Sequence, residues 1–272
     1  MPSTPRARVR LLARSGRAQP GLFAPLVLAQ AAEIEALPLE VFLTDPTKLA
    51  KGLTALHQAL GTDAITVFGA AEPADPVAGV GLDAAVEATA RLATTAPGEP
   101  VLVAALAGPA TLAEQATGAP ADAAGAEAVL EEIGARLLGD LKRFLEAGVN
   151  LVVVVEDALP PPAALDAWRS AVTPLVNVTR FHQAAPVMVV REATAEALSG
   201  VPPSIGLCGP EGTAIGGPPT RVRGVALAAE PKEWAASPPG TPLTVTSGVV
   251  PRTCGFAEVL EACRRVADGL VP

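Results

Sequence analysis

The sequence predicts a parallel α/β fold of the (β/α)8 barrel type, and three observations support this class. Eight short runs of Val, Ile, Leu and Ala are apolar on both faces, as buried parallel strands are. Longer segments rich in Ala, Leu and Glu, with a helical period, separate several of these runs. The chain has 272 residues, a length typical of one such barrel, so we predict a single domain over residues 1–272.

The first predicted element is a basic segment, residues 6–17, which is an amphipathic lead-in to the first strand. Eight predicted strands then follow along the chain. They cover residues 22–28, 64–68, 101–106, 151–155, 186–190, 204–208, 222–228 and 242–247. An open, doubly wound sheet is the competing architecture. Such a sheet usually carries a glycine-rich dinucleotide-binding fingerprint after its first strand, and this chain has none there.

Three crossover helices have clear boundaries. Residues 46–60 follow Asp45, a residue type that caps helix N-termini, and residues 125–147 are followed by Gly148, a residue type that ends helices. The third helix is the C-terminal segment 256–270. Gly and Pro replace the helical pattern over residues 208–222 and 228–242. We therefore predict that these two late crossovers are shortened or non-helical.

Charge and composition exclude several classes of protein. The net charge is −8 and the pI is about 4.9, which argues against a surface that binds nucleic acid. The chain contains no run of about 18 apolar residues, so the sequence predicts no membrane span. The three cysteines lack the spacing of a disulfide framework, which is typical of a reducing compartment. We therefore expect a cytoplasmic protein that acts on a small-molecule substrate.

Polar residues follow most of the predicted strands. In a (β/α)8 barrel the carboxyl ends of the strands, with the loops after them, converge on the face where ligands bind. This rule selects eleven candidate site residues, which are Gly108, Thr111, Glu156, Asp157, Arg191, Glu192, Cys208, Glu230, Ser247, Arg252 and Cys254.

The charged candidates suggest specific roles. Glu156 and Asp157 are paired acids at a strand end, and such acids serve as a general base or hold a substrate amine. The alternative is that one of them caps the next helix or pairs with a loop backbone. Arg191 can hold a substrate carboxylate with its planar guanidinium. Arg191 and Glu192 can equally be a surface pair that opens a helix.

The two histidines are predicted to be structural. His57 lies in the middle of the predicted helix 46–60, far from any strand end, and His182 precedes the fifth strand and so belongs to the opposite face. A zinc site in this chain would therefore need two cysteines and carboxylates, a less common ligand set than those with histidine. Cys263 falls inside the last helix and is predicted to be buried packing.

Four segments, in order, resemble the uroporphyrinogen decarboxylase superfamily. They are "DPTKLAKGLTALHQALGTDAITVF", "VAALAGPATLAEQATG", "LLGDLKRFLEAGVNLVVVVEDAL" and "GVVPRTCGFAEVLEACRRVADGL". This superfamily contains the decarboxylase, corrinoid-linked and coenzyme M methyltransferases, and the cobalamin-independent methionine synthase. "EAGVNLVVVVEDAL" is similar to the methionine synthase strand that ends in Asp-Glu-Pro-Ala-Leu, and "PRTCGF" to its Pro-Asp-Cys-Gly-Leu zinc segment. The resemblance implies a (β/α)8 barrel with its site at the strand carboxyl ends.

The chain departs from the family at its best-defined sites. Zinc-dependent members carry His-x-Cys at a strand end, whereas "GLCG" here has Gly206 in place of the histidine before Cys208, and the fifth strand ends in "VVRE". Cys208, Glu230 and Cys254 therefore form only a reduced candidate zinc set. The decarboxylase has a catalytic Asp after its second strand, where this chain reads "GAAEP".

The resemblance implies a one-carbon methyl transferase that acts on a small thiol or acid. Glu156 and Asp157 are then the base or amine-binding groups and Arg191 the anion clamp. Gly108, Thr111, Glu192, Ser247 and Arg252 are predicted to bind substrate. The implied cofactors are zinc and a corrinoid (cobalamin), and the implied partners are a corrinoid protein or a second copy of the chain. Two alternatives stay open: a non-catalytic barrel that binds a corrinoid or tetrapyrrole, and a decarboxylase whose cationic pocket uses Arg14, Arg17, Arg191 and Arg252.

Overall fold

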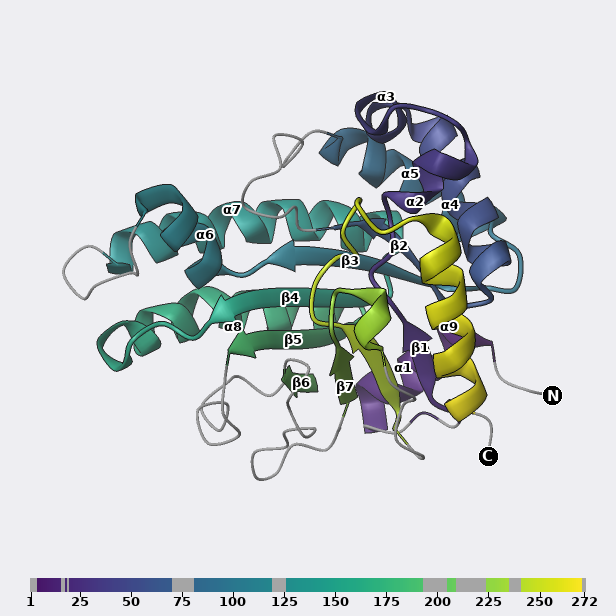
Figure 1. The fold of residues 1–272 in the computed structure, drawn as a ribbon. Helices are drawn as coiled ribbons and strands as arrows, with labels where there is room; N and C mark the ends of the chain where they lie inside the picture. Colours follow the sequence, from purple (N-terminus) through teal and green to yellow (C-terminus); the bar gives the residue numbers. More distant parts are fainter. Residues whose placement is uncertain are drawn as a thin grey trace.

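A computed structural model of the chain describes residues 4–15, 18, 20–69, 81–118, 126–192, 205–208, 224–234 and 241–270 (Figure 1). The strands within these ranges are β1 (Leu22–Ala24), β2 (Ala64–Phe68), β3 (Val101–Ala107), β4 (Leu151–Ala158), β5 (Ala185–Glu192), β6 (Ile205–Cys208), β7 (Gly224–Leu227) and β8 (Leu243–Thr246). All eight lie at the predicted places, and every strand pair is parallel. The predicted parallel α/β class is therefore confirmed.

The strands form two sheets. One has the order β2-β3-β4-β5-β6 and the other β1-β8-β7. β6 contacts β7, and β1 contacts β2, so the strands follow one another in circular order. Within the described residues, however, no ladder of backbone hydrogen bonds joins the two sheets at these places. Closure of the barrel therefore stays a prediction.

The missing ladder between β1 and β2, which we call the β1–β2 seam, has a local cause. Pro25 directly follows β1 and has no N–H to donate to a ladder. The Thr66 hydroxyl instead donates to the Pro25 carbonyl at 3.2 Å. Earlier along the chain, the N–H of Asp63, which precedes β2, donates to the Phe23 carbonyl at 3.0 Å, and the Phe23 N–H donates to Asp63 Oδ2 at 2.9 Å. Two side-chain bonds and one backbone bond thus stand in place of a ladder between β1 and β2, and β1 ends well before the predicted residue 28.

The helices are α1 (Pro5–Ser15), α2 (Gln30–Ile34), α3 (Leu39–Thr44), α4 (Pro46–Leu60), α5 (Leu82–Thr95), α6 (Pro109–Thr117), α7 (Ala126–Ala147), α8 (Leu165–Phe181) and α9 (Phe256–Leu270). The three predicted crossover helices are confirmed as α4, α7 and α9. Asp45 caps α4, accepting from the N–H groups of Thr47 and Lys48, and these bonds lower the pKa of its carboxyl. Most of the 208–222 crossover lies outside the described residues, and the 228–242 crossover contains a 3-10 turn, Pro231–Glu233.

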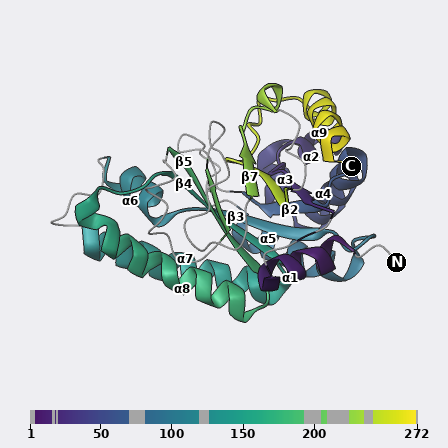
Figure 2. The same cartoon turned by 90° about the horizontal axis from the view of Figure 1, so that it is seen from below.

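Side chains alternate between two hydrophobic cores. The inner core lies on one face of the strands and contains, for example, Val153 of β4, Val189 of β5 and Val245 of β8. The outer core lies between the strands and the helices and contains Trp168 and Phe144. Figure 2 shows α7 and α8 along one side of the five-stranded sheet. This alternation decides which strand-end residues face inward.

Helix α1 packs against the inner core at the amino ends of the strands (Figure 2). Val9 and Leu12 are members of the inner core. Arg8 is buried, forms an ion pair with Asp63, and donates to the Pro20 and Gly21 carbonyls at 3.2 and 2.9 Å. The basic lead-in is thus a helix that fastens this end of the fold. None of the helices in the described ranges is long and apolar enough to cross a membrane.

Candidate functional site at the strand carboxyl ends

Strand alternation separates the paired acids Glu156 and Asp157. Val153 and Val155 of β4 belong to the inner core, and Val154 belongs to the outer core. Glu156 therefore points outward toward the helices, and Asp157 lies on the inner side. On β5, Val187 and Val189 are inner residues, which puts Arg191 on the inner side as well. The carboxyl ends of two neighbouring strands thus present an acidic residue, Asp157, and a basic residue, Arg191, on the same face.

Asp157 and Arg191 form an ion pair, which we call the rim pair. Arg191 Nη1 lies 2.7 Å from Asp157 Oδ1, and the two side chains are 37% and 39% exposed. Arg191 Nε also donates to the Ser247 carbonyl at 3.0 Å. Ser247 follows β8, so Arg191 connects the two sheets across the inner face. The structure thereby brings together three of the predicted site residues, with the backbone rather than the hydroxyl of Ser247 making the contact.

Gly248 makes room for the Arg191 guanidinium. A Cβ atom at position 248 would lie 2.2 Å from Arg191 Nη2, closer than any non-bonded contact allows. Any larger residue would therefore push the guanidinium out of its position. Sequence reasoning did not select Gly248, and its only signal was its place directly after the eighth strand.

Glu156 is fully buried, and both of its carboxylate oxygens accept hydrogen bonds. Oε1 accepts from the Ala110 N–H at 3.1 Å and from Trp168 Nε1 at 2.6 Å. Oε2 accepts from the N–H and the hydroxyl of Thr111, both at 2.8 Å. Burial raises the pKa of Glu156, and the donors, Trp168 foremost, act in the opposite direction.

The geometry makes Glu156 the N-terminal cap of α6. Gly108 stands at the cap position without a side chain, and a Cβ there would lie 2.1 Å from the Glu156 carboxyl carbon. The Thr111 hydroxyl also accepts from the Asp157 N–H at 2.8 Å, which ties the rim pair to this buried network. Gly108, Thr111 and Glu156 thus lie together behind the rim pair. One of the acids does cap a helix, but it is the preceding helix α6 and not the next one along the chain, as the alternative had it.

The N-termini of α6 and α9 are both occupied by carboxylates of the protein. The Phe256 N–H, at the start of α9, donates to Glu33 Oε2 at 3.0 Å. The two helices follow β3 and β8, so both N-termini belong to the carboxyl end of the strands. Backbone N–H groups at helix N-termini commonly bind anionic ligands. Here such groups already have partners within the chain.

The predicted metal ligands are only partly brought together. Cys254 is buried in the outer core, and its thiol donates to Glu230 Oε2 at 3.4 Å. The backbone of Cys208 is in register with Val190, and its side chain lies outside the described residues. The part of the chain that the structure describes contains no group of three possible ligands. Two donors are fewer than the three or four protein ligands that zinc uses, so the described residues do not fit a zinc ion.

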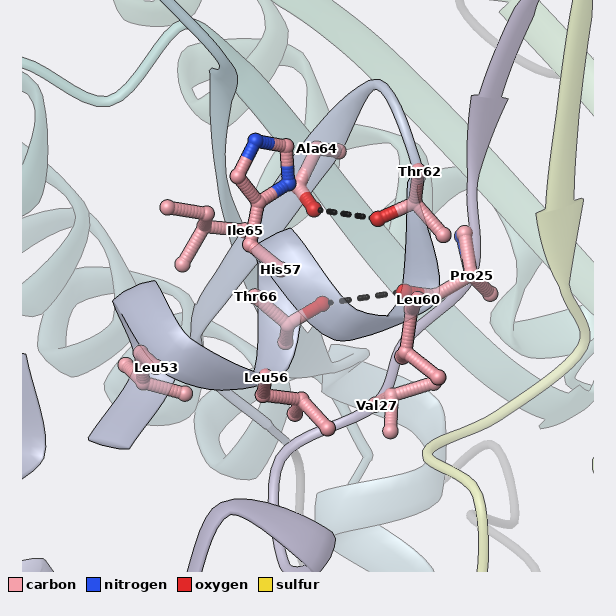
Figure 3. A pocket seen from close by; sticks show the side chains of 10 residues that line it. All are labelled: Pro25, Val27, Leu53, Leu56, His57, Leu60, Thr62, Ala64, Ile65 and Thr66. Atoms are coloured by element: carbon pink, nitrogen blue, oxygen red, sulfur yellow. Dashed lines mark hydrogen bonds between the residues drawn. The ribbon is translucent and has the colours of Figure 1, made fainter. Parts of the chain in front are cut away.

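The remaining candidates do not join the rim pair. Arg252 is exposed in the turn before α9. The Glu192 backbone pairs with Ala158, and its side chain is not among those described. His57 lies in a small pocket between α4 and the β1–β2 seam, beside Thr62 and Thr66, whose dashed bonds are drawn in Figure 3. Burial lowers the pKa of His57. No charged side chain lines this pocket, which fits a structural role for the histidine.

Comparison with known proteins gives similarities in structure and none in sequence. No family model matches the sequence, and neither does any curated protein. A solved methyltransferase from Methanosarcina mazei superposes with a TM-score of 0.69, covering 98% of each chain at 15% sequence identity. This chain has that protein's fold. At this low identity the likeness extends to the fold and to nothing finer.

We expect Cys254 and Cys263 to resist alkylation in the native protein. Burial raises the pKa of the Cys254 thiol to about 11 and that of Cys263 to about 12, and only the thiolate reacts. Peptide mass spectrometry after brief treatment with iodoacetamide near neutral pH should find both unlabelled, and both labelled in urea. Rapid labelling of native Cys254 would contradict a buried, protonated thiol.

Proposed function

We propose that residues 1–272 form one (β/α)8 barrel. We propose further that this barrel transfers a methyl group to or from a small acid or thiol. The rim pair at the strand carboxyl ends carries this proposal, because it exposes an anion-binding and a proton-accepting group side by side on the inner face. The shared fold with a protein named as a methyltransferase supports the reaction class. The family resemblance of the sequence points the same way.

In this proposal the rim pair contacts the substrate. Arg191 binds its acidic group, and Asp157 binds an amine or accepts a proton. Glu156, predicted as a catalytic acid, is better suited to hold α6 and the Asp157 backbone, because its oxygens already accept four hydrogen bonds. Gly108 and Thr111 then shape the site from behind, while Glu192 and Arg252 stay candidates for substrate contacts.

The cofactor proposal favours a corrinoid over zinc. A corrinoid, free or on a partner protein, supplies the methyl carrier, and a second copy of the chain is the other candidate partner. We derive no step through zinc, since Cys254 and Glu230 offer two donors only. Less than about a tenth of an equivalent of zinc in protein purified without added metal would remove a role for it, since a zinc that is part of the fold survives purification.

A transfer assay tests the proposal. The protein is mixed with methylcobalamin and, in turn, with homocysteine and 2-mercaptoethanesulfonate, and loss of the methylcobalamin absorbance is followed. We expect demethylation that depends on protein and thiol, and Arg191→Gln should lower its kcat/KM about 10- to 100-fold, as loss of a charged hydrogen bond does. Arg169→Gln is the matched control, because Arg169 is also paired with an Asp at 2.7 Å, but within helix α8 and not at a strand end.

The same assay separates the two alternatives. A spectral shift of bound cobalamin without turnover would support a binding protein instead of an enzyme. The decarboxylase alternative is less favoured, because it needs Arg14 in a cationic pocket. Arg14 donates to Gln183 at 3.1 Å, and Gln183 precedes β5, at the opposite end of the strands from Arg191. If neither thiol is methylated and no spectral shift is seen, the methyl-transfer proposal is contradicted.

A further inference from the structure

We propose that an anionic ligand binds Arg191 by displacing Asp157, so that the rim pair is a switch and not a fixed ion pair. This inference rests on the proposed function's choice of site, but it concerns how the site accepts its ligand. It predicts that Asp157 opposes anion binding in the resting protein and becomes available to the ligand once the anion is bound.

Arg191 is held by contacts that do not involve Asp157. Its Nε donates to the Ser247 carbonyl at 3.0 Å, and its Nη2 fits against Gly248, where no Cβ intrudes. Only Nη1 is engaged by Asp157, at 2.7 Å. The guanidinium can therefore keep its position when the Asp157 carboxylate leaves. An incoming carboxylate can then bind Nη1 and Nη2 together, in the two-pronged geometry that arginine favours.

The exposure of the pair makes this exchange easy. Both side chains are more than one third exposed, and ion pairs of this kind contribute little to stability because water and salt screen them. The neighbouring acid, Glu156, differs from Asp157 in both burial and hydrogen bonding. It is fully buried with four donors, so no ligand can replace it at low cost. The chain therefore has one fixed and one exchangeable acid side by side.

The exchange leaves Asp157 beside the bound ligand. Its backbone is still fixed by the bond from its N–H to the Thr111 hydroxyl, so only the side chain moves. A carboxylate released from its arginine can accept a hydrogen bond or a proton from an amine or thiol of the same ligand. Binding of the acidic group at Arg191 would in this way prepare the base for the reacting group.

Acetate binding tests the exchange without any assay of turnover. Acetate is titrated into the 15N-labelled protein, and the Arg191 Nε–H signal is followed by NMR. The Asp157→Asn variant should bind acetate about two- to fivefold more tightly than the wild type, the factor that a partly exposed ion pair contributes. Asp166→Asn, which removes the acid of the Arg169 pair at the same 2.7 Å distance, should leave the affinity unchanged.

A second pair of variants tests how Arg191 is held. Gly248→Ala should weaken acetate binding without changing any charge, while Gly139→Ala, where a Cβ meets nothing within 4 Å, should not. Equal or weaker binding by Asp157→Asn would overturn the exchange, as would acetate binding that survives Arg191→Gln. Tight acetate binding with the expected order of variants, but no methyl transfer, would sink the proposed function and leave this inference standing.

Discussion

Trp168→Ala should lower the free energy of unfolding by about 4 kcal/mol, within the range for removing a buried tryptophan. Trp168 is 0% exposed in the outer core, and its Nε1 donates to Glu156 Oε1 at 2.6 Å. The substitution opens a cavity and also removes a hydrogen-bond donor from a buried carboxylate. The two effects together cost more than either effect alone. Urea unfolding followed by circular dichroism measures the change.

Two further variants separate the causes. Trp168→Phe keeps most of the volume and should cost about 1–3 kcal/mol, the penalty of leaving the Glu156 oxygen short of a donor. Phe181→Ala removes another aromatic ring, but Phe181 is 82% exposed, so the change should stay within about 0.5 kcal/mol. A Trp168→Ala protein that loses less than about 1 kcal/mol would show that the network around Glu156 is not a core element.

Arg8→Ala should lower the free energy of unfolding by about 3 kcal/mol, as breaking a buried ion pair does. The Arg8 side chain is 9% exposed, and its partner Asp63 is 24% exposed. Its loss leaves two backbone carbonyls, of Pro20 and Gly21, without their donor. It also weakens the attachment of α1 to the inner core. Thermal and urea unfolding should both report the change.

Arg143→Ala is the matched control for Arg8. Arg143 also pairs with an aspartate, Asp83, but the Asp83 side chain is 90% exposed. Exposed pairs contribute about 0–1 kcal/mol, so this variant should unfold almost as the wild type does. Equal losses for the two variants would mean that burial does not distinguish the two pairs, and that α1 is not fastened through Arg8.

Much of the fold could be predicted because its signals are local. Runs that are apolar on both faces marked the strands, and Asp45 and Gly148 marked helix ends. The first strand was predicted too long. Its apolar residues continue to residue 28, but Pro25 has no N–H to donate, and the strand ends at Ala24. Helices α2, α3, α5, α6 and α8 were not assigned. α6 is short and follows Gly-Pro, and α8 contains Pro174, so their sequences carry weak helical signals.

Sequence order predicted which strand ends carry polar residues, but not how these residues contact one another. Arg191 and Asp157 were selected by their place after the strands, and they do form one pair. The different orientation of Glu156 follows from alternation, yet only if β4 is extended beyond the predicted residue 155. The partners of Glu156, above all Trp168, lie twelve or more residues away and meet it only in three dimensions. The same holds for the outer-core position of Cys254, which sequence order cannot reveal.

The carboxylates at the N-termini of α6 and α9 affect which substrates this scaffold can come to accept. They neutralise the positive ends of both helix dipoles, so a phosphate ester finds these two helix ends closed. Among the described residues that face the inner side at the strand carboxyl ends, Arg191 is then the group that would meet an acidic ligand. Replacing Arg191 would therefore change the charge of this part of the surface without altering either helix end.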